Sequence, residues 1–299
     1  MFVTPGRLQT FLAIVEHGSA RAAAAHLSVT ESAISASLAA LHREIGVVLL
    51  ERSGRGLRLT ESGLIFAEYA RRILGLMDES LAATRHGRDA ERGRLRLGTV
   101  ATAGEYLAPS LLASFTRRYP DVEVTLEVGV RDHVLARLAD HQLDVVIGGR
   151  PPTGRGLATL ATRPNSLVVI AAAGPVPDLA KATWLLREPG SGTRDATLAL
   201  LAALQLYPRT LTLGSHGAVV ASTVLGLGVT VVSADAVAQH LQQDSLQRVP
   251  ARGTPLDRPW HAVGSATPTA TTRLFVDHLT DGRQAGGLAF KARRIRTAG

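Results

Sequence analysis

The stretch Thr10–Gly63, TFLAIVEHGSARAAAAHLSVTESAISASLAALHREIGVVLLERSGRGLRLTESG, decides the fold of the first part of the chain. Apolar residues from Leu8 to Val15 follow the i, i+3, i+4, i+7 spacing of an amphipathic helix. Ser19 is a favourable N-cap residue and predicts a short second helix. After a tight turn, apolar residues from Ile34 to Ile45 predict a third helix, over 30–44. Two short helices followed by an apolar-striped helix indicate a helix-turn-helix.

The polar side of the third helix carries the candidate DNA contacts. Small and hydroxyl side chains let a helix approach base edges and phosphates closely. The candidate residues are Thr30, Glu31, Ser32 and Ser35. One alternative is that all four residues simply face solvent. For Glu31 a second alternative is open: it completes a capping box with Ser28, or occupies the first turn of the helix, instead of accepting a hydrogen bond from a cytosine.

The segment LLERSGRGLRLT (49–60) follows the third helix and predicts two short strands joined by a glycine-containing turn. Its arginines include Arg52 and Arg55. A basic hairpin beside a helix-turn-helix is typical of a wing that grips the phosphate backbone. An exposed charged hairpin without a partner is the alternative, but it leaves the order of the three elements unexplained.

Residues 8–63 resemble the LysR-type transcriptional regulators. The shared features are Gly18-Ser19, Ala22-Ala23, Leu27, Ser35, Leu41, Gly46, Leu49, Glu51-Arg52, Arg55, Leu59-Thr60 and Gly63. The resemblance implies a winged helix-turn-helix over 1–60, a linker and dimerisation helix over 61–92, and an effector-binding domain over 93–299. The chain departs from the family at Glu31-Ser32, where Gln-Pro is common, and at Ala36, His42 and Leu50, so the base-specific contacts stay open.

The second part of the chain alternates β-branched runs with helical segments, which predicts an α/β fold with largely parallel sheets. The Pro- and Gly-rich stretch 148–156 precedes a change in composition, and we expect the chain to cross between lobes near 150–165. The resemblance implies a two-lobed domain like that of periplasmic binding proteins. We assign 93–163 and 264–299 to lobe I, and 164–263 to lobe II.

Candidate effector-binding residues lie where strands give way to helices. Glycines bring the backbone close to a ligand, hydroxyls donate, and arginine pairs with carboxylate or phosphate. The candidates are Thr102, Ser191, Gly192, Thr193, Arg194 and Ser215. The run GSGTR (190–194) is similar to a subgroup that includes regulators of carbon-fixation operons, which implies an anionic effector. An ordinary glycine-rich turn, with Arg194 in a salt bridge, is the alternative.

Composition and motifs argue against other classes of protein. The chain has 299 residues, no cysteine and a net charge of +8, to which the tail after residue 282 contributes five basic residues and no acidic one. That tail either touches DNA or lies in solvent. Phosphate-binding loops, HExxH and GxSxG are absent, so we expect no enzyme, no metal and no cofactor. The uncharged stretch 210–234 contains four glycines and predicts strand, helix and strand rather than a membrane span.

The sequence therefore predicts a cytoplasmic DNA-binding regulator whose promoter binding responds to a small anionic metabolite. Expected partners are double-stranded DNA with an interrupted palindrome, further copies in a homodimer or homotetramer, and RNA polymerase, but no membrane. A cytosolic metabolite-binding protein without a role in transcription is the alternative.

Overall fold

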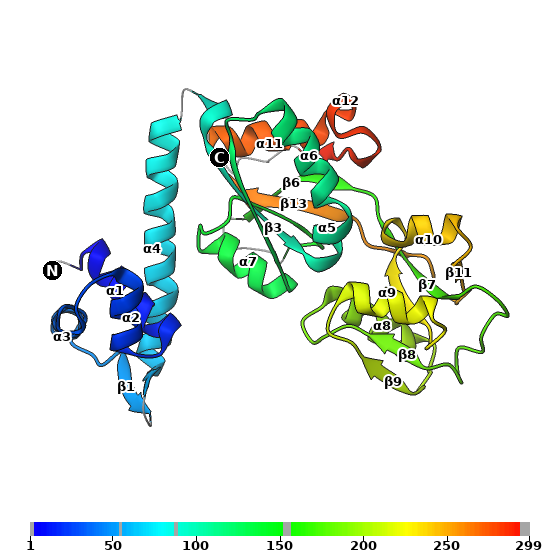
Figure 1. Cartoon of the computed structure of the whole chain (residues 1–299), viewed down its shortest axis with the longest axis horizontal. Coiled ribbons are helices and arrows are strands. Elements are labelled where there is room, and N and C mark those ends of the chain that lie inside the picture. Colours follow the sequence, from blue (N-terminus) through cyan, green and yellow to red (C-terminus); the bar gives the residue numbers. More distant parts are fainter. Residues whose placement is uncertain (1–2, 54–55, 87–88, 152–156, 294–299) are drawn as a thin grey trace. The chain divides into compact units, whose positions relative to one another are not determined.

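The computed structural model describes residues 3–53, 56–86, 89–151 and 157–293. The chain divides into two compact units (Figure 1). The first contains Met1–Arg85 with Asp140–Gln142, and the second contains His86–Ala139 with Leu143–Gly299.

Three helices and a two-stranded hairpin open the first unit. They are α1 (Pro5–His17), α2 (Ala20–Leu27), α3 (Glu31–Ile45), β1 (Leu50–Ser53) and β2 (Gly56–Leu59). Leu8, Phe11, Ile14, Ile34 and Leu41 lie in one buried cluster, which confirms the helical stripes expected from the sequence. Burying each of these large side chains contributes about 1.5–3 kcal/mol.

Polar caps begin and end the helices of the first unit. Ser19 Oγ accepts from the N–H of Ala22 at 3.2 Å, as expected of the N-cap of α2. Thr30 Oγ1 accepts from the N–H of Ala33 at 3.2 Å and caps α3. The capping box of Ser28 with Glu31 is wrong, because Ser28 ends α2 with a positive φ of 56°. Glu31 occupies the first turn of α3, the other alternative.

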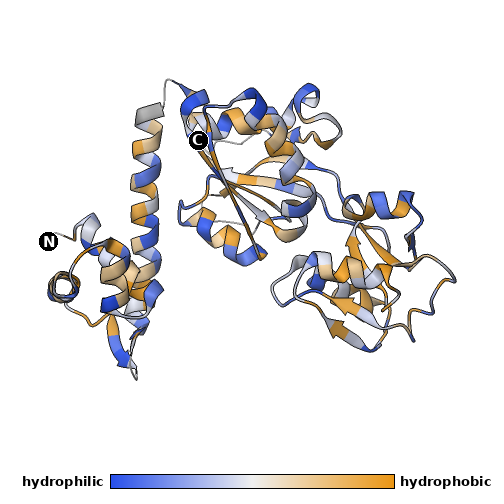
Figure 2. Ribbon diagram, viewed as in Figure 1, coloured by the Kyte–Doolittle hydropathy of each residue, from blue (hydrophilic) through white to orange (hydrophobic). Residues whose placement is uncertain are grey.

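A single long helix, α4 (Glu61–His86), follows the hairpin. Gly63 is required at its start, because a Cβ there would lie 1.9 Å from the carbonyl oxygen of Leu49. The helix carries hydrophilic and hydrophobic bands along its length (Figure 2). Ala67 and Ala70 are buried in the same cluster as Phe11 and Ile34, whereas one series of apolar side chains is exposed. That series comprises Leu64, Ile65, Tyr69, Ile73, Leu76, Met77 and Leu81.

Lobe I of the second unit is a mixed sheet with strand order β14-β6-β13-β5-β3-β4. Its strands are β3 (Arg94–Val100), β4 (Glu123–Gly129), β5 (Val145–Gly148), β6 (Leu157–Arg163), β13 (Trp260–Ser265) and β14 (Lys291–Ala292). Its helices are α5 (Ala101–Tyr106), α6 (Ala108–Arg118), α7 (Arg131–Ala139), α11 (Ala270–Thr280) and α12 (Gly282–Ala285). β3 is parallel to β4 and β5, as expected, and β13 is antiparallel to both of its neighbours.

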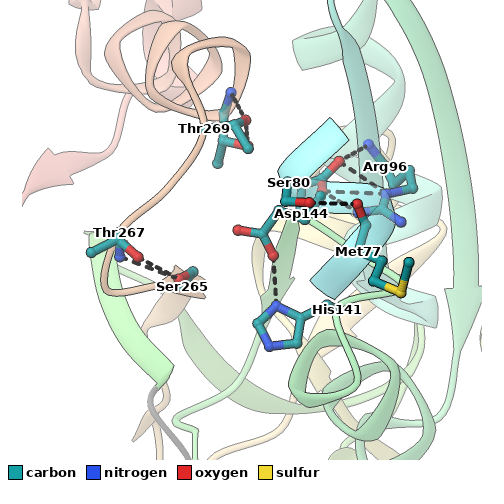
Figure 3. Close-up of polar contacts among 10 residues, drawn as sticks. Met77, Ser80, Arg96, His141, Asp144, Ser265, Thr267 and Thr269 are labelled. Atoms are coloured by element: carbon teal, nitrogen blue, oxygen red, sulfur yellow. Dashed lines mark hydrogen bonds and ion pairs between the residues drawn. The ribbon is translucent and has the colours of Figure 1, made fainter. Parts of the chain in front are cut away.

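An ion pair joins β3 to the start of β5. The Nη2 of Arg96 lies 2.7 Å from Asp144 Oδ1, and the N–H of Arg96 donates to Asp144 Oδ2 at 2.7 Å (Figure 3). Both side chains are at most 14% exposed. A carboxylate that accepts from a backbone N–H and a guanidinium together holds the two parallel strands in register.

Lobe II is built around β7 (Ser166–Ala172). Its other strands are β8 (Trp184–Leu186), β9 (Thr210–Thr212), β10 (Thr230–Ser233), β11 (Leu246–Arg248) and β12 (Leu256–Asp257), and its helices are α8 (Gly192–Ala203), α9 (His216–Val224) and α10 (Ala238–Gln242). β8 and β9 are parallel, but β10, β11 and β12 are all antiparallel to β7. The expectation of largely parallel sheets is therefore wrong for the β7 sheet. β10 and β11 flank β7 and are connected through α10, and β7 runs between them in the opposite direction.

The described chain crosses between the lobes at 163–166 and again at 257–260. The predicted return to lobe I at residue 264 falls inside β13, which pairs with lobe I from Trp260 onward. Asn165 connects the two crossings. Its Nδ2 donates to the carbonyl oxygen of Arg258 at 2.8 Å, and its Oδ1 accepts from Ser233 Oγ at 2.5 Å.

Candidate functional site

The exposed face of α3 carries the residues predicted to contact DNA. Glu31, Ser32 and Ser35 are exposed, and Thr30, the N-cap residue, lies 3.0 Å from Ser32 through their hydroxyl oxygens. A surface groove runs from this helix to the hairpin, and Glu31, Ser35 and Arg52 are among its lining residues. The structure thus brings these three predicted residues together.

The wing, formed by β1 and β2, has the antiparallel register expected of a tight hairpin, with Ser53 opposite Gly56. Arg52 is exposed on β1. Arg55, the second predicted wing contact, lies outside the described residues. Arg58 on β2 faces across the hairpin to Glu51, with Nη2 2.7 Å from Oε1.

His42 also lines this groove and was not predicted as a site residue. Its Nε2 accepts from the N–H of Leu49 at 3.3 Å, which ties α3 to the segment leading into the wing. Burial lowers the pKa of His42 below its ordinary value, in keeping with a neutral ring that accepts this hydrogen bond.

A cleft of ≈ 330 Å³ in the second unit is lined by residues of both lobes. Four of the six predicted effector-binding residues line it: Thr102, Ser191, Gly192 and Thr193. Thr102 lies where β3 passes into α5, and the other three lie at the start of α8. These are strand-to-helix transitions, where backbone N–H groups lack partners within the helix.

Arg194 and Ser215 do not line the cleft. Arg194 Nη1 donates to the carbonyl oxygen of Arg187 at 2.7 Å and to Thr212 Oγ1 at 3.1 Å, so it links the end of β8 to β9. The salt bridge of the alternative interpretation is not found among the described residues, because both partners of Arg194 are neutral oxygens. Ser215 caps α9 by accepting from the N–H of Ala218 at 3.1 Å.

The cleft contains arginines that sequence reasoning missed. Among its described lining residues, one is acidic, Glu188, and four are arginines: Arg131, Arg150, Arg187 and Arg258. They come from four separate segments, so no motif in the sequence groups them. The signal that could have found them is a position within two residues of the end of a strand, which they share with Thr102.

Two buried polar atoms of this lining have no hydrogen-bond partner among the described residues. They are the Nε of Arg131 and the Nε1 of Trp260. A buried donor left unpaired costs about 1–3 kcal/mol, so such groups call for an explanation. Both residues line the cleft.

Arg187 and Glu188 form a fork within the lining. Arg187 Nε donates to Glu188 Oε2 at 2.7 Å, and its Nη2 donates to Oε1 at 2.6 Å. Burial alone would raise the pKa of Glu188, but these hydrogen bonds, a backbone hydrogen bond and the charge of Arg187 together outweigh it, and the pKa is lowered. Glu188 is therefore charged at neutral pH.

A group of titratable residues surrounds this fork. The buried ring of His216, on α9, meets Tyr106, on α5, edge to face with centroids 5.2 Å apart. Burial, reinforced by the charge of Arg187, lowers the pKa of His216 to about 4. Neither of its ring nitrogens has a partner among the described residues. Burial raises the pKa of Glu105, which the charge of Arg187 opposes.

Neither a metal centre nor a membrane span is found in the described part of the chain. No three histidine or carboxylate side chains there are grouped to hold a metal ion. None of the described helices combines the length and apolar character needed to cross a bilayer.

Comparison with known proteins agrees with both halves of this architecture. Residues 5–64 match the bacterial regulatory helix-turn-helix protein, lysR family, and residues 88–284 match the LysR substrate binding domain. The chain belongs to the LysR family. It is a DNA-binding transcriptional regulator with a region that binds a small-molecule effector, and this family consists of regulators rather than enzymes.

Two regulators are similar to the chain over more than nine-tenths of its length. The chain is 30% identical to the HTH-type transcriptional regulator CfxR of Cupriavidus necator, covering 96% of each chain. It is 31% identical to the RuBisCO operon transcriptional regulator of Acidithiobacillus ferrooxidans, covering 91% of this chain and 92% of that one. A solved structure, the CcmR regulatory domain of Synechocystis PCC6803 in complex with 2-PG, is 30% identical, with a TM-score of 0.57, and covers 62% of this chain and 94% of that one.

Proposed function

We propose that the cleft binds a small anionic metabolite and that its occupation changes how the regulator engages promoter DNA. The observation that carries this proposal is the charge of the cleft lining, which contains four arginines and one glutamate among its described residues. Guanidinium groups are the usual partners of carboxylate and phosphate, because they donate two parallel hydrogen bonds.

The unpaired donors of the cleft support the same class of ligand. Arg131 Nε and Trp260 Nε1 would each gain an acceptor from a bound anion. Thr102, Ser191, Gly192 and Thr193 would supply hydroxyl and backbone donors at helix starts, where an anion is favoured.

The relatives narrow the chemistry further. One of them regulates a RuBisCO operon, and another is solved with 2-PG. We infer that this regulator acts on carbon-fixation genes and responds to 2-PG or a metabolite of similar size and charge. The run Gly190–Arg194 supports this subgroup.

On the DNA side, α3 would enter the major groove with Thr30, Glu31, Ser32 and Ser35 near the bases and phosphates. Arg52 and Arg55 would contact the phosphate backbone or reach the minor groove. The exposed apolar residues of α4 support pairing of this helix between two copies of the chain. The pair would place two winged helix-turn-helix regions on the two halves of an interrupted palindrome. Assembly to tetramers and contact with RNA polymerase complete the proposal.

The test uses the full-length protein, its own upstream DNA and a random duplex of equal length. Fluorescence anisotropy is measured with and without 2-PG at several salt concentrations, because phosphate contacts make affinity salt-dependent. We expect tighter binding to the upstream DNA, altered by 2-PG. Equal affinity for both duplexes in every condition would reject the DNA part of the proposal. Calorimetric titration that detects neither 2-PG nor inorganic phosphate would reject the anionic effector.

A further inference from the structure

Arg187 and Glu188 already satisfy each other in the cleft. Two nearly equal hydrogen bonds, of 2.7 and 2.6 Å, join the guanidinium to both carboxylate oxygens. This is the same bidentate geometry by which arginine binds the carboxylate or phosphate of a ligand. An internal anion therefore occupies the face of Arg187 that an anionic ligand would use.

The two partners differ in freedom to move. The side chain of Arg187 is 5% exposed, whereas that of Glu188 is 26% exposed. Arg187 is further held through its carbonyl oxygen, which accepts from Arg194. Removing the counter-ion of a buried guanidinium is strongly unfavourable, but a carboxylate at the surface is readily solvated by water. Glu188 is thus the partner that can leave, provided another anion takes its place.

We propose that Glu188 is an internal counter-ion of the cleft, which pairs with Arg187 while the cleft is empty and is exchanged for the anionic group of the effector. This inference rests on the proposed function. The exchange makes Glu188 a specificity-determining residue, because a neutral compound of the same shape offers Arg187 no replacement charge and leaves the pair intact. The residue also sets the concentration at which the regulator responds.

A second carboxylate provides a matched control. The charge of Arg187 acts on Glu105 as it does on Glu188, but among the described contacts Glu105 makes no hydrogen bond with Arg187. If Glu188 merely repels anions through its charge, neutralising either glutamate has a similar effect. If Glu188 competes directly for Arg187, only its own neutralisation frees the guanidinium.

The experiment titrates full-length wild type, Glu188→Gln and Glu105→Gln with 2-PG and with inorganic phosphate by isothermal calorimetry at neutral pH. We expect Glu188→Gln to bind both probes about 10-fold tighter, which corresponds to an Arg187 that is free in about one-tenth of wild-type molecules. Glu105→Gln is expected to change affinity less than about twofold. In an Arg187→Lys background, where the fork is lost, the gain from Glu188→Gln is expected to disappear.

Several results overturn the inference. Equal gains for the two glutamine variants would show a general charge effect. Unchanged or weaker binding by a folded Glu188→Gln, beside a wild type that binds, would reject the exchange and leave the proposed function standing. Failure of every variant and of wild type to bind either probe would reject both. Should Glu188→Gln not fold, Glu188→Asp, which shortens the fork by one methylene, is expected to bind about threefold tighter, and unchanged affinity would reject the exchange.

Discussion

The groove beside α3 and the cleft of the second unit are built in opposite ways. Around α3, short side chains such as Ser32 and Ser35 are exposed, and the positive charge of Arg52 lies on a separate hairpin. In the cleft, arginines line the site itself, and Arg187 is almost completely buried. The comparison teaches that the surface at α3 allows a partner to approach closely but carries little charge of its own. In the cleft, charge is held away from water, where each unit of charge counts for more.

The strongest way to separate the two sites is to place a negative charge on α3. Ser35→Glu is expected to reduce affinity for the upstream DNA by at least about 100-fold, because a carboxylate on the exposed face repels phosphates and keeps the helix from the groove. Effector affinity is expected to stay within about twofold. The measurements are anisotropy for DNA and calorimetry for 2-PG.

Gln9→Glu is the matched control for this variant, because Gln9 is exposed on α1 and adds the same charge elsewhere. Its effect on DNA affinity is expected to be less than about threefold. A similar loss in the two variants would mean that overall charge, rather than the face of α3, governs binding.

The reciprocal change removes a charge from the cleft. Arg131→Gln is expected to weaken 2-PG binding by about 10- to 100-fold, since a hydrogen bond to a charged group contributes about 1.5–3 kcal/mol. Effector-free DNA binding is expected to be unchanged. Arg137→Gln is the control on the same helix, because Arg137 Nε lies 3.1 Å from Glu127 Oε2 and outside the cleft lining. Unaltered 2-PG affinity in Arg131→Gln would remove Arg131 from the site.

Because His216 is buried, the stability of the second unit depends on pH. Its pKa is about 4 in the folded chain, below its ordinary 6.5, so the unfolded chain gains a proton at this residue as the pH falls below 6.5 and the folded chain does not. The contribution of His216 to the free energy of unfolding is therefore fully present above pH 6.5 and is lost progressively as the pH falls to 4. Between pH 7 and pH 5 this loss amounts to about 2 kcal/mol.

His216→Phe retains a ring beside Tyr106 and removes the titration, so the free energy of urea unfolding of this variant should fall less between pH 7 and pH 5. His133→Gln is the control, because His133 is exposed and pairs with Glu127. The same pH dependence in wild type and His216→Phe would contradict the assignment.

The smallest effect is expected for Arg194. Arg194→Ala should lower the free energy of unfolding by about 1–2 kcal/mol, since it removes hydrogen bonds to Arg187 and Thr212. Its effect on 2-PG affinity should be smaller than that of Arg131→Gln. Thr212→Val, which removes only one of these bonds, should cost less. Full stability combined with a large loss of 2-PG affinity would restore Arg194 as a direct ligand.

The two sites also differ in how far their residues could be predicted. The residues around α3 lie within about 25 positions of one another, so local signals such as the cap at Ser19 and the apolar stripe from Ile34 to Ile45 were enough to place them. The predicted residues of the cleft, Thr102 and Ser191–Thr193, were found because a strand-to-helix transition is itself a local signal.

The features that could not be predicted depend on contacts between segments that lie far apart in the chain. Arg150 and Arg258 are far apart in the chain and reach the same cleft only through the sheet order of lobe I and the second crossing. Arg194 has the right residue type at the right turn, but its side chain bonds to Arg187 and Thr212. The antiparallel direction of β7 has the same cause, because alternation of strands and helices does not reveal which strand is inserted between two others.

Asn165 reaches both chain crossings with one side chain, donating to the carbonyl oxygen of Arg258 while lying on the other crossing itself. The N–H of Arg258 donates in turn to the carbonyl oxygen of Asn165 at 2.9 Å. Sliding of one crossing along the other would break both of these hydrogen bonds, whereas a change in the angle between the lobes would keep them. Asn165 and Arg258 would then form a hinge about which a bound effector tilts one lobe against the other.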